Sequence, residues 1–536
     1  MSGRMDQGTP MTAFTGTATL LRFHLRRDRM MLVWWIAGSV LLYVSQAVST
    51  DGIYKTQAEL DTAAKGMESN AAFIAMAGPA RALNTVGGQV AWQAAAFGAI
   101  VAGLMSMFLI GRHTRAEEES GRDELMRAAV VGRHAPLAAA GLVCLIADVL
   151  LGALISAGLI AYGLPVAGSV VLGLAAGLAG LVFGAVTLLG AQLSQGTRGA
   201  YAITGGVIAL SYVLRAIGDI GNGALSWLSP IGWGQYMRAY AGEVWWPALI
   251  SVTAVALLCI GAVRLFDRRD MGSGVWTARP GPARGGAMLG TTLGLSWRLQ
   301  RASLISWTAG LFLAGLSYGS IGDDVNSLLG DSQFSKDVFG HGGGTLVDSF
   351  YGVMAMMLAL IATGFTVGSV LRLRSEESDH FAELLLSTAE PRWRWAASHL
   401  TVAGLGTVVV IAAGGAGLGL SFALVTGDSS AIPRLFGATF QYVVAVLLIG
   451  ALSWLVYAVR SAWGSVGWAL LGFCSVVMLF GETLRLPDWL MDASPFQHLA
   501  LLPADDFRPL PWLVLLVLSA VVGAAGMAAL RRRDLA

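Results

Sequence analysis

The chain has 536 residues, of which 55% are hydrophobic and only 13% are charged, and its mean hydropathy is +0.65. Soluble domains carry about 25% charged residues, so this chain has too few charges to cover a water-facing surface. The composition excludes a soluble enzyme, a disulfide-rich secreted scaffold and a disordered protein. It predicts an all-α polytopic membrane protein, for which the lipid bilayer is a partner and nucleic acid is not.

Apolar runs long enough to cross a bilayer recur about twelve times, because a crossing helix needs about 20 mostly apolar residues. The predicted spans are 31–49, 91–111, 137–161, 169–193, 201–217, 247–265, 304–321, 351–371, 395–425, 436–458, 463–481 and 511–530. The run 395–425 is long enough to be tilted, or to be broken at Gly414-Gly415.

Arginine is distributed unevenly between the two sides that these spans define. If both termini are cytoplasmic, most arginines fall inside and slightly more than half of the acidic residues fall outside. Such a cytoplasmic excess of basic residues follows the positive-inside rule. We therefore expect a multi-pass protein of the plasma (inner) membrane with both termini in the cytoplasm. The polar lead before residue 31 is long for a signal peptide, which favours a retained first span.

The two halves of the chain carry similar short motifs in the same order, which indicates an internal duplication. The matched pairs are Trp35-Ile36-Ala37-Gly38 with Trp307-Thr308-Ala309-Gly310, Arg115-Ala116-Glu117-Glu118 with Arg374-Ser375-Glu376-Glu377, and Arg269-Asp270 with Arg533-Asp534. Each half holds an even number of predicted spans, about six, which makes the two repeats parallel.

The duplication divides the chain into four parts. Residues 1–30 are a cytoplasmic N-terminus with a basic interfacial helix, which we expect to lie along the inner membrane surface before the first span. Residues 31–271 are the first six-span repeat, and residues 291–536 are the second. The Gly- and Pro-containing segment 272–290 between them is a cytoplasmic linker.

The densest charge lies between the second and third spans of each repeat. If each segment is helical, Glu117 and Glu124 share one face, as do Glu376 and Glu383. One interpretation is a solvated loop helix that obeys the positive-inside rule. The other is a docking element for a cytoplasmic partner, which the repeated order of the charges favours. The candidate coupling residues are Arg115, Glu117, Glu118, Glu119 and Glu124 in the first repeat, and Arg374, Glu376, Glu377 and Glu383 in the second.

The sequence has no phosphate-binding loop of its own. Such a loop needs Gly-Lys followed by Ser or Thr, and the only lysines are Lys55, Lys65 and Lys336. Only Lys55 precedes a hydroxyl residue, and Tyr54 stands where the loop needs glycine. Asp148 is the one clear acid predicted at mid-membrane, where it serves either as a helix–helix hydrogen-bonding group or as a relay. We therefore expect that the chain is not an enzyme and binds no cofactor or metal.

The basic lead helix, the six spans per half, the repeated Arg-x-Glu-Glu segment and the long outer stretch before each sixth span resemble the permease of an ABC-2 type exporter. More narrowly, the fused twelve-span form resembles actinobacterial permeases for polyketide and ionophore antibiotic efflux, the tetronasin-resistance type. The resemblance implies export of hydrophobic compounds such as antibiotics, drugs or lipids. It also implies two copies of a separate cytoplasmic ATPase subunit, which would bind ATP and Mg²⁺ and contact the candidate coupling residues.

A hydrophobic cargo needs a deformable apolar passage, which Met and aromatic side chains can supply. The candidate passage residues are Phe97, Met105, Phe108, Tyr212, Met354 and Met357, although an ordinary core or lipid-facing role is the simpler interpretation of each. An ion-coupled carrier of the major-facilitator type is the alternative, but Gly111-Arg112-His113-Thr114-Arg115 does not fit its loop motif. A lipid-modifying enzyme is disfavoured, because no His/Asp/Glu cluster lies within a predicted span.

Overall fold

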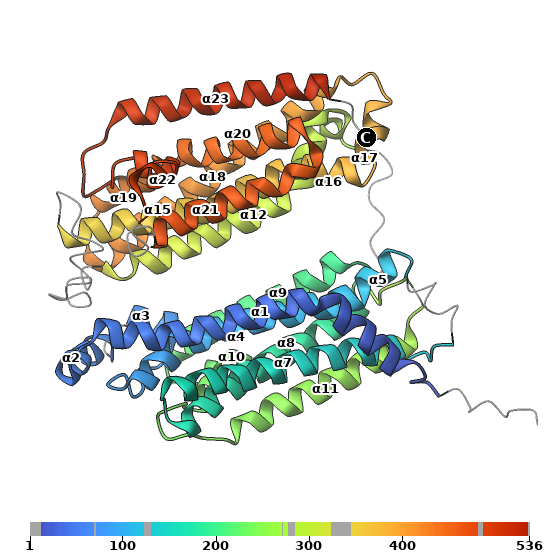
Figure 1. Cartoon of the computed structure of the whole chain (residues 1–536), viewed down its shortest axis with the longest axis vertical. Helices are drawn as coiled ribbons and strands as arrows, with labels where there is room; N and C mark the ends of the chain where they lie inside the picture. The colour runs from blue at the N-terminus through green and yellow to red at the C-terminus, as the bar shows by residue number, and fades with distance from the viewer. Residues whose placement is uncertain are drawn as a thin grey trace, which may run out of the picture. The chain divides into compact units, whose positions relative to one another are not determined.

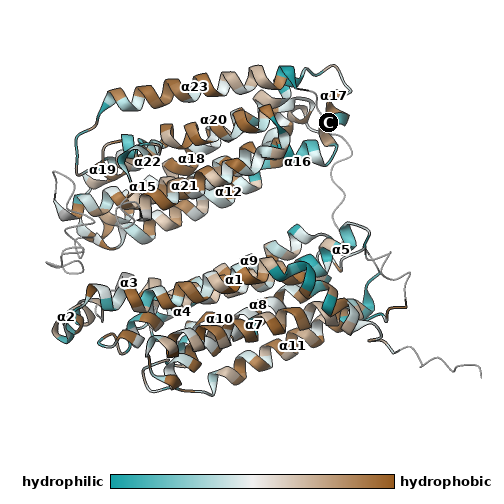
Figure 2. Ribbon diagram, in the orientation of Figure 1, coloured by the Kyte–Doolittle hydropathy of each residue, from teal (hydrophilic) through white to brown (hydrophobic). Residues whose placement is uncertain are grey.

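The computed structural model describes residues 12–68, 71–122, 130–270, 272–276, 285–322, 345–480 and 486–533. These residues form helices and loops, and none of them lies in a strand (Figure 1). Within this part of the chain, eleven helical segments are long and apolar enough to cross a membrane. Figure 2 shows hydrophobic residues along the long helices and hydrophilic residues gathered mainly toward helix ends and connections. The protein is therefore a polytopic all-α membrane protein, as its composition predicts.

The chain folds into two compact units, which we call unit 1 (Met1–Pro280) and unit 2 (Gly281–Ala536). The boundary between them lies within 272–290, the segment that the sequence predicts to be a linker. Each unit has its own buried side chains and its own set of long helices.

Unit 1 is built around α8, whose apolar window is the most deeply buried of the eleven. The helices α4, α7, α9, α10 and α11 all pack against it. The elements of unit 1 are α1 (Thr17–Ile53), α2 (Gln57–Glu68), α3 (Ala71–Ala77), α4 (Val86–His113), α5 (Arg115–Glu119), α7 (Ala135–Tyr162), α8 (Val166–Leu193), α9 (Thr197–Ile220), η1 (Leu225–Leu228), α10 (Pro230–Tyr236) and α11 (Pro247–Arg268).

Unit 2 contains α18, which is the longest described helix after α1 and is continuous. Its elements are η2 (Ala287–Gly290), α12 (Thr292–Gly319), α15 (Leu346–Val370), α16 (Arg372–Ser378), α17 (Phe381–Leu386), α18 (Arg392–Thr426), α19 (Ala431–Phe440), α20 (Val443–Val459), η4 (Ser461–Ser465), α21 (Val466–Phe480), α22 (Asp488–Met491), η5 (Pro495–His498) and α23 (Pro509–Arg532). Because α18 runs through Gly414-Gly415 without interruption, the break that the sequence allowed there does not occur.

Long helices of the two units follow one another in the same order and have the same kinds of neighbours. In unit 1, α1 packs on α7 and α8 packs on α4 and α11. In unit 2, α12 packs on α18 and α20 packs on α15 and α23. The helices at corresponding places in the chain therefore make corresponding contacts within each unit.

Two features of the helices differ from the sequence-based expectation. The basic lead and the first span form one helix, α1, because neither Gly nor Pro interrupts residues 17–37. The seventh predicted span, 304–321, falls on α12, which is not among the eleven helices that are apolar enough to cross by composition. Ser, Thr and Gly residues lower the hydropathy of α12.

Glycines allow close approach of helix backbones in both units. On α8, an added Cβ at Gly173 would meet the carbonyl oxygen of Gly152 on α7. On α12, an added Cβ at Gly315 would meet the carbonyl oxygen of Gly414 on α18. Membrane helices associate through such small residues, since lipid supplies no hydrophobic drive between them. The Gly-containing α12 is thus held by a close backbone contact with α18.

Candidate functional site

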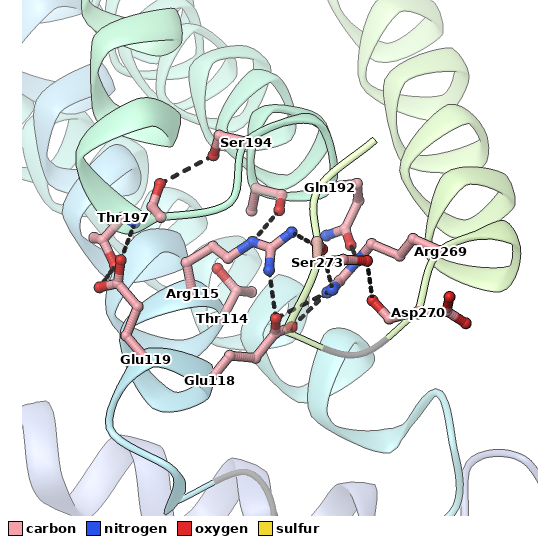
Figure 3. Close-up of polar contacts among 12 residues, drawn as sticks. Thr114, Arg115, Glu118, Glu119, Gln192, Ser194, Thr197, Arg269, Asp270 and Ser273 are labelled. Atoms are coloured by element: carbon pink, nitrogen blue, oxygen red, sulfur yellow. Dashed lines mark hydrogen bonds and ion pairs between the residues drawn. The ribbon is translucent and has the colours of Figure 1, made fainter. Parts of the chain in front are cut away.

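The charged segment of unit 1 begins where α4 ends. Thr114 has φ −121° and ψ −93°, which ends α4, and the short helix α5 follows. Figure 3 shows that the side chains of α5 meet the ends of α8 and α9 and the residues that follow α11. The segment therefore contacts three long helices at one end of unit 1.

Glu118 is held between two arginines. Arg115 Nη1 donates to Glu118 Oε2 at 2.6 Å, Arg269 Nη1 donates to the same oxygen at 3.1 Å, and Arg269 Nη2 donates to Oε1 (Figure 3). Arg115 is 1% exposed and also donates to the carbonyl oxygens of Ala191 and Ser273. Because Arg269 follows α11 directly, this cluster of charge-assisted hydrogen bonds fastens α5 to the end of the last long helix of unit 1.

The other two glutamates of α5 join it to α1 and α9. Arg27 of α1 donates to Glu117 Oε1, and Arg122 lies 3.9 Å from the same oxygen. Glu119 accepts hydrogen bonds from the backbone nitrogen and the hydroxyl of Thr197, at 2.8 and 2.6 Å. Thr197 is the first residue of α9, where the helix dipole favours a carboxylate. Each acid of α5 thus binds a different part of unit 1.

A second buried cluster fastens the basic lead of α1 to the end of α4. His113 Nε2 bonds to Asp28 Oδ2, and Arg112 Nη1 lies 3.1 Å from Asp28 Oδ1. The ring of His24 stacks on that of His113 with centroids 3.9 Å apart. His24, Asp28 and His113 are all buried. The lead of α1 is therefore part of the charged end of unit 1 and not a separate surface helix.

Unit 2 has the same ion pair between its charged segment and the end of its last helix. Arg533 follows α23 directly, and its Nη2 donates to both carboxylate oxygens of Glu377 at 2.6 Å. Tyr457 of α20 donates its hydroxyl to Glu377 Oε2 at 2.6 Å. In the matched motifs, Glu377 corresponds to Glu118 and Arg533 to Arg269. Each unit therefore has a Glu–Arg ion pair that joins its charged segment to the end of its last long helix.

Glu376, the first glutamate of the motif in unit 2, binds residues of α18. Trp395 Nε1 donates to Glu376 Oε2 at 3.2 Å, and His399 Nε2 lies 3.2 Å from the same oxygen. Arg372 Nε lies 3.6 Å from Glu376 Oε1. Its counterpart Glu117 binds α1 instead, so the first glutamate has different partners in the two units.

The predicted continuous helix that would place Glu376 and Glu383 on one face is wrong. The helices α16 and α17 are separate, because His380 between them takes a left-handed φ of 61°. Glu376 is buried, whereas Glu383 is exposed, and Glu383 Oε1 lies 2.8 Å from His380 Nδ1. This contact with Glu383 raises the pKa of His380 above its usual value. Glu124 lies outside the described residues, so the face that it would share with Glu117 stays a prediction.

Four of the candidate coupling acids are buried or nearly buried and are paired within their own unit. They are Glu117, Glu118, Glu376 and Glu377. In unit 1, Arg115 is buried and pairs with Glu118. In unit 2, Arg374 is half-buried and lies beside Gly464. Because ion pairs connect the segment to the helix ends, a displacement of the segment would move those ends with it.

The short helix α17 presents two large apolar side chains outside the candidate membrane spans. Phe381 is 61% exposed and Leu384 is 70% exposed. They flank the exposed Glu383. Apolar side chains exposed next to a charge are typical of a surface that contacts another protein.

The candidate passage residues of unit 1 do not gather at one place. Phe97 and Phe108 are on the exposed face of α4, whereas Met105 of the same helix is in the core of the unit. Tyr212 of α9 donates its hydroxyl to the carbonyl oxygen of Met76 at 2.9 Å. Only the two phenylalanines are therefore open on α4.

In unit 2, Met354 is buried and Met357 is half-buried on α15. A groove of about 300 Å³ opens between α15, α18, α20 and α23, and neither methionine lines it. Its lining includes Thr366, Leu400, Leu447, Trp454, Leu516 and Ser519. The groove is mostly apolar and suits a hydrophobic molecule or a lipid chain.

Asp148 is fully buried where α7 meets α4 and α8. Ser106 Oγ donates to Asp148 Oδ2 at 2.8 Å, and Cys144 Sγ donates to the same oxygen at 3.3 Å. Thr407 follows Arg374 in unit 2 at the same sequence distance as Asp148 follows Arg115. There, Thr366 Oγ1 and Thr407 Oγ1 are 2.7 Å apart. Each unit thus has an interhelical hydrogen bond at this matched position. The bond involves a carboxyl group in unit 1 and two hydroxyl groups in unit 2.

Sequence reasoning missed the partners of the buried glutamates. The Arg-Asp pair that ends both halves was an available signal for Arg269 and Arg533, since an arginine just after an apolar helix is well placed to meet an acid at that membrane surface. Nothing distinguished Arg27 from the neighbouring arginines of the lead, or Tyr457 from other aromatic residues of the spans.

The fold and the charged segments define a multi-pass helical membrane protein with two similar units. Residues 289–531 match the family described as the C-terminal domain of the multidrug efflux system permease Rv1217c. The chain is 38% identical over 528 residues to the multidrug efflux system permease protein Rv1217c of Mycobacterium tuberculosis (strain ATCC 25618 / H37Rv). The matched residues make up 98% of this chain and 96% of that protein. The chain belongs to this family of multidrug efflux permeases, and its role is that of a transport permease.

Proposed function

We propose that the chain is the permease subunit of an ATP-driven ABC exporter of the ABC-2 type, and that it effluxes hydrophobic compounds such as antibiotics, drugs or lipids. Two copies of a separate cytoplasmic ATPase would bind ATP and Mg²⁺, since the chain has no phosphate-binding loop. The protein would lie in the plasma membrane with both termini in the cytoplasm. The two units would be the products of an internal duplication.

The observation that carries this proposal is the ion pair that recurs in both units. Glu118 with Arg269, and Glu377 with Arg533, each tie a segment between two long helices to the end of the last helix. A segment fixed in this way can pass a force from a cytoplasmic partner to several helices at once. Two such segments in one chain suit two copies of a partner.

The buried acids hold the segment in place, and exposed side chains would form the contact with the ATPase. The described candidates are Phe381, Leu384 and Glu383 on α17. This proposal changes the role expected from the sequence, in which the glutamates themselves contact the partner. Buried and paired carboxylates are poorly available to another protein, because breaking their pairs costs several kcal/mol.

Purification from native membranes tests the proposal. We expect the intact chain to retain an ATPase subunit, and Leu384→Asp to lose most of it while the permease remains folded. The matched control is Ser378→Ala, which changes an exposed residue at the end of the adjacent α16. An intact chain that carries no ATPase in any mild detergent would argue against the proposal, as would full retention by the Leu384→Asp variant.

An ion-coupled carrier is the second candidate, and Asp148 is the observation that favours it. A carboxyl group in the middle of a membrane protein is the usual means of binding a proton during transport. The hydroxyl pair of Thr366 and Thr407 at the matching place in unit 2 argues that this position serves helix packing instead.

A further inference from the structure

Unit 1 contains a small cavity at the end that holds α2 and α3, opposite the end that holds α5 (Figure 1). Its volume is about 40 Å³, and the connection between α3 and α4 closes one side of it. Its lining includes Arg81, Trp92, Gln235 and Arg238. A cavity of this size admits a small polar group and is too small for the apolar body of a drug or a lipid.

Two arginines line this cavity. Arg81 Nη1 donates to the backbone oxygen of Gln235 at 3.0 Å, and its guanidinium lies 5.5 Å from the ring centre of Tyr236. Arg238 is exposed at the cavity. Burial lowers the pKa of Arg81, and the positive charge of Arg238 lowers it further. The two side chains therefore repel each other across a shared space.

Asp219 is an acid whose charge acts on Arg81, and it already forms an ion pair with Arg215. Asp219 Oδ2 lies 3.5 Å from Arg215 Nη1 on the same helix, α9. Ser226 also donates to Asp219 at 2.6 Å. Further acids such as Glu243 lie at this end of unit 1 as well. The positive charge is confined to the lining of the cavity, where Arg81 and Arg238 are the charged residues.

The backbone around the cavity is strained. Four described residues other than glycine have positive φ, and three of them are here: Ala82 at 49°, Arg238 at 53° and Tyr240 at 60°. Such conformations persist only where the surrounding structure imposes them, and they gather at ligand sites. The hydroxyls of Tyr240 and Ser169 share a 2.8 Å hydrogen bond, which helps to hold this backbone in place.

Hydrogen bonds fix the walls of the cavity, and one buried polar atom in its lining has no hydrogen-bond partner among the described residues. Gln235 Nε2 donates to the oxygen of Ala77 at 2.7 Å, and Trp92 Nε1 donates to that of Gly78 at 2.8 Å. Gln235 Oε1 is buried and accepts no hydrogen bond from the described residues. A ligand group that carries both a negative charge and a hydroxyl would complement the two guanidinium groups and this amide oxygen.

We propose that this cavity binds the phosphate group of an anionic ligand, with Arg81 and Arg238 as its charged partners and Gln235 Oε1 as an acceptor for a hydroxyl. Guanidinium groups suit phosphate because their paired N–H donors match its oxygens. The ligand is either free inorganic phosphate or the headgroup of an anionic lipid such as phosphatidylglycerol. The site lies at the opposite end of unit 1 from α5, so it does not depend on the proposed coupling to an ATPase.

Two titrations of the full chain test the site and distinguish its sources. In neutral detergent, inorganic phosphate is titrated against chloride at constant ionic strength, and the thermal unfolding midpoint is recorded. In lipid nanodiscs, phosphatidylglycerol replaces phosphatidylcholine stepwise with the same readout. We expect saturable stabilisation in at least one titration, and Arg238→Gln and Arg81→Gln to weaken the apparent affinity at least about tenfold.

The matched control is Arg508→Gln, which removes an exposed arginine of unit 2 and should leave both titrations unchanged. Stabilisation by phosphate in detergent assigns a free anion, and stabilisation by phosphatidylglycerol alone assigns a lipid headgroup. Arg238 is exposed, so its variant should fold even if Arg81→Gln does not. The proposal is overturned if neither ligand stabilises the chain, or if Arg238→Gln responds like the wild type.

Discussion

Replacing Glu118 by alanine should destabilise the protein by about 3 kcal/mol, because it leaves Arg115 and Arg269 without their shared carboxylate. Both arginines are almost completely buried. Each would keep hydrogen bonds to backbone carbonyls but would lose its counter-charge. The free energy of unfolding in detergent micelles, measured by denaturant titration, gives the loss directly.

Two comparisons separate this ion pair from a general effect of changing the segment. Glu119→Ala, on the same helix, removes an exposed carboxylate that binds only Thr197 among the described residues, and should cost about 1 kcal/mol or less. The double variant Glu118→Ala with Arg269→Ala should cost less than the sum of the single changes. If Glu118→Ala costs no more than Glu119→Ala, the ion pair does not hold the segment.

Replacing Gly315 by leucine should disrupt unit 2 more than any surface change. An added Cβ at this position meets the carbonyl oxygen of Gly414 and lies 2.8 Å from the backbone nitrogen of Leu418, so α12 and α18 would have to separate. Overpacking in a tight contact costs about 1–3 kcal/mol, and a leucine here collides with backbone that cannot move alone. We expect a loss at or above the upper end of that range, seen as a large fall in the thermal unfolding midpoint or in the yield of folded protein.

The same helix supplies the control for this prediction. Gly310 is exposed, and an added Cβ there would have no atom within 4 Å. Gly310→Leu should therefore leave the unfolding midpoint within a few degrees of the wild type. Equal effects of leucine at the two glycines would mean that close packing does not hold α12 against α18.

Most of the long helices could be predicted from the sequence, because an apolar run of sufficient length has few other structures in a bilayer. The exceptions have identifiable causes. The lead of α1 is polar but continues the first span, since nothing in its sequence interrupts a helix. The helix α12 is less apolar than the eleven candidate spans. Its packing depends on the face that carries Gly315, which lies against α18. Hydropathy does not report which face of a helix a glycine occupies.

The candidate site was predictable in place but not in detail. The repeated Arg-x-Glu-Glu motif located both charged segments, and the residues around it do meet at one end of each unit. Its chemistry depends on long-range pairs such as Glu377 with Arg533, which join distant parts of the chain. The break at His380 was not visible either, because a left-handed residue that is not glycine has no clear sequence signal.

Transport assays on cells that contain the chain and the proposed ATPase subunit test the central claim most directly. The measurement is the efflux of a fluorescent hydrophobic dye, once with ATP depleted and the proton gradient maintained, and once with a protonophore and ATP maintained. The account predicts that efflux stops only when ATP is depleted, and that Asp148→Asn pumps nearly as well as the wild type. Efflux that continues without ATP but stops with the protonophore, or that Asp148→Asn abolishes in a folded protein, would contradict it.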